Sequence, residues 1–257
     1  MFAQLIHQLS QIPQIEAIAL GGSRATDRFD EASDYDVYLY CTAPVPEELR
    51  RDILSGYCSC MELGNTFWET EDNCTLNNGI DMDILYRDLD GFCQGIADVV
   101  ENYQAHNGYT TCMWHNLLTC KILYDRDGRL AALKQRFSVA YPPQLRKNII
   151  QRNGKLLFDH MPSYDSQIRK AVLRRDLVSI NHRVAAFLES YFDILFALNG
   201  KTHPGEKRLI SLCRQTCPVL PGRFEENLEA LLQHMFHEPE QLEGDLEKIR
   251  AELSKIL

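Results

Sequence analysis

The chain has no long apolar run, no basic N-terminal leader and no excess of basic residues, and each absence removes a class of function. The most apolar later stretch, Val184 to Leu198, contains Glu189 and Asp193 and is too short to span a bilayer. No Lys or Arg precedes Arg24, and polar residues interrupt the apolar ones before it, so the sequence predicts no secretory signal. We therefore expect a cytoplasmic protein with no membrane partner.

Positive charge is scarce relative to negative charge. The 257 residues include 27 Lys and Arg against 36 Asp and Glu, which gives a formal net charge of −9. Nucleic acid and anionic membranes repel an acidic chain at long range, and this chain has no extended basic tract, so the sequence disfavours nucleic acid as a partner. The charge balance suits partners that are small, cationic or bridged by a metal ion.

Cysteine patterns typical of disulfide frameworks or zinc sites are also missing. The nine cysteines are odd in number and scattered, and a chain of this length needs no covalent staples. The nearest approach to a zinc pattern, Cys58-Ser-Cys60 followed by Cys74, lacks a fourth ligand at a recognisable spacing. We expect free thiols and no structural zinc.

The sequence does contain two kinds of periodicity, one after the other. In the first third, short apolar runs alternate with helical patterns, which predicts a small mixed sheet. The expected strands are Ile15–Leu20, Asp36–Cys41, Cys58–Leu63 and Ile80–Tyr86. The expected helices around them are Phe2–Leu9, Pro46–Leu54 and Asp90–Tyr103.

From about residue 125 onward every pattern is helical. The expected helices are Gly128–Phe137, Gln144–His160, Ser163–Arg174, Leu177–Leu198, Glu206–Arg214, Phe224–Phe236 and Pro239–Ile256. The predicted fold class is therefore α+β, with a mixed-sheet core at residues 1–125 followed by an all-helical bundle domain at residues 126–257.

The segment after the first strand carries the residues with chemical potential. Gly21-Gly22-Ser23 follows that strand directly, and glycines there let the backbone turn sharply and present N–H groups to an anion. Asp34 and Asp36 open the next strand two residues apart, so their carboxylates point to the same face. Two such charges repel each other unless a divalent cation lies between them.

A second pair of acids, Asp81 and Asp83, shares one face of the strand-like run that begins at Ile80. An acid among Ile, Met and Leu is costly to bury unless it serves a metal or a proton transfer. A glycine-serine turn, an Asp-x-Asp pair and a third acid on a later strand together suit a magnesium-bound nucleoside triphosphate. Taken singly, each piece is also compatible with an ordinary turn or with solvated acids.

These residues resemble the signature of the nucleotidyltransferase superfamily that shares its catalytic core with DNA polymerase beta. That signature, Gly-[Gly/Ser]-Ser followed after about ten residues by Asp-x-[Asp/Glu], is matched by Gly21, Gly22, Ser23, Asp34 and Asp36. Within the superfamily the chain is similar to bacterial adenylyltransferases that modify aminoglycosides or lincosamides. Its helical half, over residues 140–215, is similar to an uncharacterised domain often attached to such cores.

The resemblance implies a reaction in which an acceptor hydroxyl attacks the α-phosphorus of a nucleoside triphosphate and pyrophosphate leaves. It implies that Asp34, Asp36 and Asp83 are catalytic and bind one or two Mg²⁺ ions, with the third carboxylate completing the metal site or taking the hydroxyl proton. Gly22 and Ser23 would hold the β- and γ-phosphates. We expect ATP as the donor and a small hydroxyl-bearing molecule as the acceptor.

The third carboxylate is assigned from the resemblance, with two alternatives left open. The family's acid usually precedes an apolar pair and then Tyr-Arg, which the run Ile84-Leu85-Tyr86-Arg87 supplies. This favours Asp83 over Asp81, and a solvated edge-strand position remains the structural alternative.

Two cationic residues are further candidates for binding the nucleotide. Arg24 follows the serine and could reach a phosphate, or it could pair with Asp27 or Asp30. Lys207 lies at the expected start of a helix, where a cation opposes the helix dipole, so it could reach the triphosphate or mark a solvated helix end.

Two other clusters are open to a functional or a structural interpretation. A basic cluster, which could be a solvated face paired with nearby acids, consists of Arg169, Lys170, Arg174 and Arg175. An expected loop between the third and fourth strands, which could bind a cationic acceptor or be structural, contains Trp68, Glu69, Glu71 and Asp72.

The leading hypothesis from the sequence is a Mg²⁺-dependent nucleotidyltransferase that moves AMP from ATP onto a small molecule. One alternative is transfer of AMP to a protein side chain, as in toxin–antitoxin systems with the same core. Another is a nucleotide-binding module without turnover. Neither the acceptor, the nucleobase preference nor the oligomeric state follows from the sequence.

Overall fold

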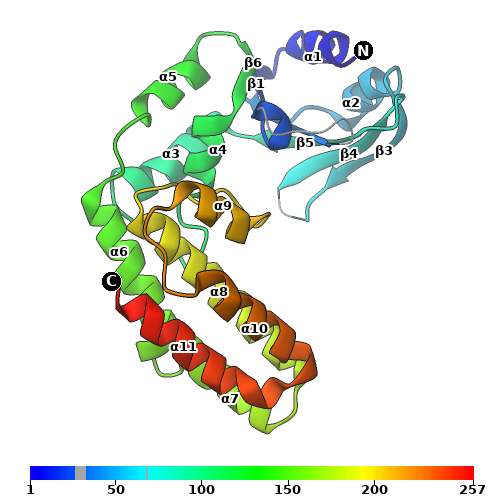
Figure 1. The fold of residues 1–257 in the computed structure, drawn as a ribbon. Coiled ribbons are helices and arrows are strands. Elements are labelled where there is room, and N and C mark those ends of the chain that lie inside the picture. The colour runs from blue at the N-terminus through cyan, green and yellow to red at the C-terminus, as the bar shows by residue number, and fades with distance from the viewer. Residues whose placement is uncertain (27–32, 68) are drawn as a thin grey trace. The chain divides into compact units, whose positions relative to one another are not determined.

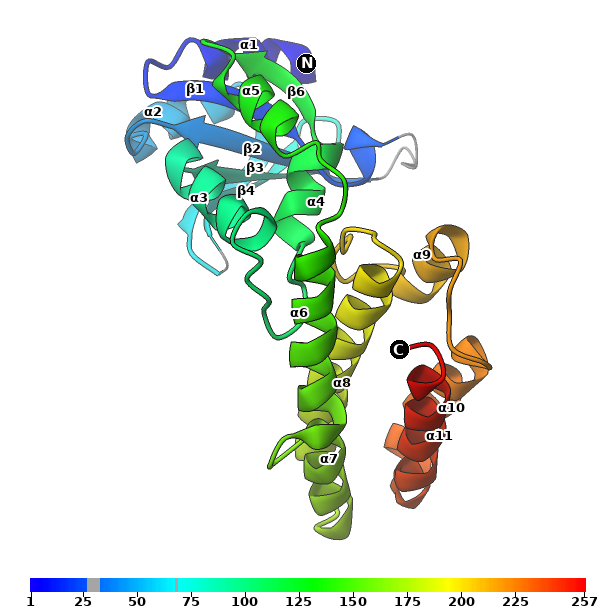
Figure 2. The same ribbon diagram turned by 90° about the vertical axis from the view of Figure 1, so that its left-hand side faces the viewer.

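A computed structural model describes residues 1–26, 33–67 and 69–257 of the chain (Figures 1 and 2). Its contacts divide the chain into two units, which we call the sheet unit and the helical unit. The sheet unit comprises Met1–Ala97 and Asn116–Val139, and the helical unit comprises Asp98–His115 and Ala140–Leu257. The chain is α+β, with a mixed sheet and a separate set of helices, as the sequence predicts.

This division differs from the expected border after residue 125 in two places. Residues 98–115 belong with the helices, and residues 116–139 belong with the sheet. Two polar networks described below, one around Asp193 and one around Arg129, hold these segments to their units.

Among the described residues, six strands form one sheet in the order β3-β4-β5-β2-β1-β6. The strands are β1 (Ile15–Leu20), β2 (Tyr35–Cys41), β3 (Cys58–Asn65), β4 (Thr70–Leu76), β5 (Asp81–Arg87) and β6 (Lys121–Asp125). Strands β2 and β5 are parallel and the other neighbours are antiparallel, which makes the sheet mixed. The helical elements before and around it are α1 (Phe2–Ser10), the short 3-10 turn η1 (Ser23–Ala25), α2 (Glu47–Leu54), α3 (Leu89–Val100), α4 (Cys112–Thr119) and α5 (Arg129–Arg136).

The four expected strands are present, and two further strands, β4 and β6, were not expected. Strand β4 places Glu71 and Asp72 in the sheet, so the expected loop over these residues is wrong. The physical reason is that the Arg50 guanidinium pairs with Asp72, which is fully buried, and this compensates for an acid in a strand. Trp68, from the same expected loop, lies outside the described residues.

The two faces of the sheet differ in character. One face is an apolar core in which α1 and α2 contribute side chains such as Leu5 and Leu54 against Val37 and Ile84. Successive side chains of a strand point to opposite faces. Asp36 and the residues of β2 at positions two and four further along therefore lie on the other face. The apolar face thereby anchors the strands while the opposite face carries the polar groups.

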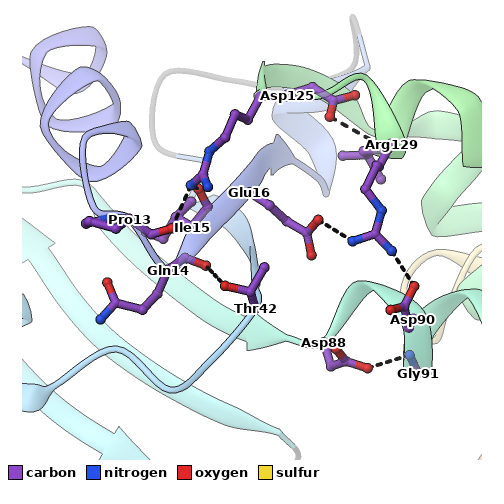
Figure 3. A network of polar contacts seen from close by, with 12 residues as sticks. Pro13, Gln14, Ile15, Glu16, Thr42, Asp88, Asp90, Gly91, Asp125 and Arg129 are labelled. Carbon is purple, nitrogen blue, oxygen red and sulfur yellow. Dashed lines mark hydrogen bonds and ion pairs between the residues drawn. The ribbon is translucent and has the colours of Figure 1, made fainter.

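A polar network ties the first strand to the helices that follow the sheet (Figure 3). Arg129, at the start of α5, bonds Glu16 at 2.6 Å and also pairs with Asp90 of α3. Asp125 accepts the backbone N–H of Ala131 at 2.8 Å, which satisfies an otherwise free donor in the first turn of α5. These contacts explain why residues 116–139 belong to the sheet unit.

The helical unit is built around α8, which is 22 residues long and matches the expected helix exactly in its bounds. From residue 143 onward, the elements in chain order are α6 (Pro143–Gly154), a π-helical turn η2 (Lys155–Asp159), α7 (Tyr164–Leu173), α8 itself (Leu177–Leu198), α9 (Leu209–Thr216), α10 (Phe224–His237), a 3-10 turn η3 (Pro239–Gln241) and α11 (Leu242–Ser254). Helices α10 and α11 lie side by side, and their apolar faces share one core with α7 and α8 (Figures 1 and 2).

A buried carboxylate on α8 holds the segment at residues 106–111 in the helical unit. Asp193 is 1% exposed and accepts the Thr110 hydroxyl at 2.6 Å and the Thr110 N–H at 3.1 Å. Asn153 of α6 donates to the same carboxylate at 3.0 Å and also accepts the N–H of Gly108. The network satisfies backbone groups of a segment that has no regular structure of its own.

The buried Asp193 makes the stability of the helical unit depend on pH. Burial raises the pKa of Asp193 to about 6, although its hydrogen bonds oppose that shift. The folded protein therefore keeps a proton that the unfolded chain has already lost, and the unfolding free energy falls as pH rises from about 4 to about 6, by about 3 kcal/mol. Urea titrations across this range measure the slope. Asp193→Asn should flatten it, and an unchanged slope in that variant would assign it to another group.

All nine cysteines lie in the described part of the chain and carry free thiols, as the sequence predicts. Within residues 1–26, 33–67 and 69–257, no helix has the length and apolar character needed to cross a membrane.

Candidate active site

The glycine turn after β1 lies directly against Asp36. The N–H of Gly21 donates to the backbone carbonyl of Asp36 at 2.7 Å. Gly22 has a φ of +60°, and a Cβ added there would lie 1.7 Å from the Asp36 Oδ2. Only a residue without a side chain fits this close approach. The structure therefore requires glycine at the second position of the sequence motif.

Asp36 and Asp83 are direct register partners on the parallel strands β2 and β5. Neighbouring strands are about 4.8 Å apart, so two acids in register point to the same face at close range. Asp81 lies two residues earlier, is exposed and accepts the Thr75 hydroxyl at 2.8 Å. The register therefore brings Asp83, rather than Asp81, beside Asp36.

A row of amides continues from Asp83 across β4 to β3. Asn73 of β4 is the register partner of Asp83 and donates its Nδ2 to the Asp83 Oδ1 at 2.7 Å. Asn65 of β3 in turn donates its Nδ2 to the Asn73 Oδ1 at 2.6 Å. Sequence reasoning missed both amides, because β4 is polar and gives no strand pattern from which a register could be deduced.

Ser23 and Asp34 lie on either side of residues 27–32 in the sequence. Ser23 is half-buried and opens η1 immediately after Gly22, with its carbonyl accepting the Thr26 N–H at 3.2 Å. Asp34 is exposed and lies one residue before β2. Ser23 therefore borders the glycine turn, and Asp34 borders the strand that carries Asp36.

Arg24 contacts Ser33 and Tyr35 among the described residues. Its Nε donates to the Ser33 carbonyl at 2.6 Å, and its guanidinium lies 4.1 Å from the centre of the Tyr35 ring. Tyr35 precedes Asp36 on β2 and therefore points to the opposite face of the sheet. Asp27 and Asp30, the expected alternative partners of Arg24, lie outside the described residues.

A polar cluster around the cation Arg87, with contacts that the sequence did not indicate, lies along the same face as Asp36. Arg87 makes two hydrogen bonds to Glu69, at 2.6 and 2.7 Å, and its guanidinium lies 4.1 Å from the centre of the Tyr38 ring. Asn116 donates to the Tyr38 hydroxyl at 2.9 Å. The sequence did contain one signal for this cluster. Side chains two residues apart on a strand point to the same face, so Tyr38 is expected on the face of Asp36.

Burial and charge set the protonation of this cluster. Burial alone would lower the pKa of Arg87, but its hydrogen bonds and charge interaction with Glu69, together with the charge interactions with Tyr40 and Tyr38, raise that pKa overall, so the guanidinium stays charged. Burial raises the pKa of Tyr38, and the nearby negative charge of Asp36 raises it further. Tyr38 is therefore a neutral hydroxyl at physiological pH, and Arg87 is a fixed cation.

The donor set on this face fits a hard cation. Carboxylate oxygens are the ligands that Mg²⁺ prefers, and Asp36 and Asp83 supply two on neighbouring strands. Across the described residues, no group of three or more His, Cys, Asp or Glu side chains is placed to hold a metal ion. The two acids in register are thus the part of the expected metal-binding set that the structure brings together, and Asp34 is not grouped with them.

Lys207 and the basic cluster both lie in the helical unit. Lys207 lies in a turn just before α9, which begins at Leu209 rather than at the expected Glu206. In the basic cluster, Arg169 lies 3.7 Å from Asp165 and 3.5 Å from Glu243, as expected for a solvated face paired with acids.

Residues 109–209 match a family model described as a domain of unknown function, DUF4037, which covers less than half of the chain. No curated protein matches the sequence.

Two solved structures are similar to the chain over its full length. One is a nucleotidyltransferase-like protein from Exiguobacterium sibiricum 255-15, with 13% identity, 74% of its own chain covered and a TM-score of 0.45. The other is an aminoglycoside 6-adenyltransferase from Bacillus subtilis, with 10% identity, 87% of its own chain covered and a TM-score of 0.33.

Proposed function

We propose that the protein is a Mg²⁺-dependent nucleotidyltransferase that transfers AMP from ATP to a hydroxyl group of a small molecule. The observation that carries this proposal is the register of Asp36 with Asp83 next to the glycine turn at Gly22. Two carboxylates and a backbone turn that presents N–H groups on one face are the parts needed to hold a triphosphate through a divalent cation.

The residues of the site have separate roles in this reaction. The turn at Gly22 and Ser23 would hold the β- and γ-phosphates, and Asp34 and Asp36 would ligate the cation. Mg²⁺, when bound there, would offset the negative charge of the phosphates. The acceptor oxygen forms a bond to the α-phosphorus, the bond from that phosphorus to the pyrophosphate oxygen breaks, and the hydroxyl proton passes to a carboxylate, for which we propose Asp83.

The amide row orients that carboxylate. Asn73 donates to the Asp83 Oδ1, and among the described residues the Oδ2 is the oxygen that remains for a metal ion or a proton. A fixed carboxylate with one oxygen committed and one available is the arrangement expected of a positioned ligand or general base. The expectation that Lys207 contacts the triphosphate stays a prediction, and no phosphate contact is proposed for Arg24, which lies against Tyr35.

Release of pyrophosphate tests the proposal. Purified protein with ATP, Mg²⁺ and a panel of aminoglycosides, lincosamides and cellular metabolites should release pyrophosphate with at least one acceptor, and chelation of Mg²⁺ should stop it. Replacing ATP by GTP, CTP or UTP measures the nucleobase preference.

Two results would contradict the small-molecule activity. Labelled ATP incubated with cell lysate would place the label on proteins if the acceptor were a protein side chain. Saturable ATP binding with no pyrophosphate release for any acceptor would indicate a binding module without turnover.

A further inference from the structure

A groove of about 690 Å³ lies on the face of the sheet opposite to Asp36. Its walls are one side of α1, the end of β1, η1, the start of β2 and the edge strand β6. All of these belong to the sheet unit. The volume falls within the range of about 300–1,000 Å³ that is usual for small-molecule sites.

One wall of the groove is a stack of three planar groups. The Phe2 ring lies 4.1 Å from the Tyr35 ring at an angle of 18°, and the Arg24 guanidinium lies 4.1 Å from the centre of the same tyrosine ring. Both groups therefore lie within stacking distance of the Tyr35 ring. A flat aromatic molecule can extend such a stack, because rings and guanidinium planes both accept aromatic neighbours.

The remaining described lining residues combine an apolar floor with positive charge. Ile6, Leu20 and Leu123 supply apolar surface, and Lys121 of β6 and Arg24 of η1 supply positive charge. None of the described lining residues is acidic, in a chain whose net charge is −9. This local reversal of charge favours an anionic ligand.

We infer that this groove binds a small aromatic anion, with its ring against the stacked wall and its sulfonate, carboxylate or phosphate group at Lys121 and Arg24. The site is separate from the candidate active site, since Tyr35 and Asp36 point to opposite faces of β2. The turn η1 joins the two regions, because Ser23 borders the glycine turn and Arg24 borders the groove.

A pair of fluorescent probes that differ in one charged group tests this site on the full-length protein. Anilinonaphthalene sulfonate is an aromatic anion, and phenylnaphthylamine is the same ring system without the sulfonate. We expect saturable binding of the sulfonate probe, with a Kd that rises about fivefold in Lys121→Gln and returns toward the original value in Lys121→Arg. Binding of the neutral probe should change less than twofold in either variant.

The matched control removes one positive charge outside the groove. Arg51→Gln neutralises an exposed cation on α2 and should leave both Kd values unchanged. The inference is overturned if the sulfonate probe shows no saturable binding, if Lys121→Gln and Arg51→Gln weaken it equally, or if the two probes respond alike to Lys121→Gln. None of these readouts depends on nucleotidyl transfer. The inference about the groove can therefore be contradicted while the proposed function stands, and the proposed function can be contradicted while the inference stands.

Discussion

Replacing Asp36 by Asn is expected to slow pyrophosphate release by at least about 1,000-fold, which corresponds to about 4 kcal/mol of lost transition-state stabilisation. The carboxylate lies beside Gly22 and in register with Asp83, where a cation that bridges the phosphates would bind. The amide has the same shape but no negative charge, so the change would remove the proposed metal ligand without creating a cavity. The measurement is the initial rate of pyrophosphate release at saturating ATP, together with the thermal midpoint of unfolding to verify the fold.

The acids of β5 provide matched controls for this result. Asp83→Asn should cause a loss of comparable size, because Asp83 faces Asp36 across the strand pair. Asp81→Asn removes the same charge two residues away, at an exposed position bonded to Thr75, and should retain activity within a few fold. Full turnover in Asp36→Asn would exclude the proposed metal role. A large loss in Asp81→Asn alone would transfer the role of the third carboxylate to that residue.

Replacing Asp72 by Ala is expected to lower the unfolding free energy of the sheet unit by about 3–5 kcal/mol. Asp72 is fully buried and pairs with Arg50, whose side chain is 9% exposed. The same carboxylate accepts the Tyr86 hydroxyl at 2.7 Å and the Gly64 N–H at 2.8 Å. Its removal leaves a buried cation and two donors without their acceptor, and such groups are costly in a low-dielectric interior. Urea unfolding followed by circular dichroism measures the change.

An exposed ion pair on the same helix provides the comparison. Arg51 and Glu47 form a pair in which both side chains are about half exposed, so Arg51→Ala should cost less than about 1 kcal/mol. The double change Arg50→Met with Asp72→Leu should recover part of the loss, because it removes the unpaired charge together with its partner. Equal costs for Asp72→Ala and Arg51→Ala would show that the buried pair has no special role.

The sequence predicted strands well where one side of the strand is apolar. Strand β1 begins and ends at the predicted residues, and β2 and β3 differ from their predicted bounds only at the ends. Strand β4 was missed because its residues Thr70 to Thr75 are mostly polar, and a polar run has the appearance of a loop until its partners are known. Strand β6 was missed because it is a short edge strand in which a register shift opposite Ile18 breaks the alternation.

The sequence by itself determined the glycine turn, the placement of Asp36 on one face of a strand and the apolar stripe of α8. Each of these follows from local geometry: the freedom of glycine, the period of two in a strand and the period near 3.6 in a helix. Only the tertiary structure decided that Asp83 rather than Asp81 faces Asp36, that Arg24 lies on the opposite face, and that residues 98–115 belong with the helices. These depend on strand register and on buried polar partners distant in sequence, and no local pattern encodes either one.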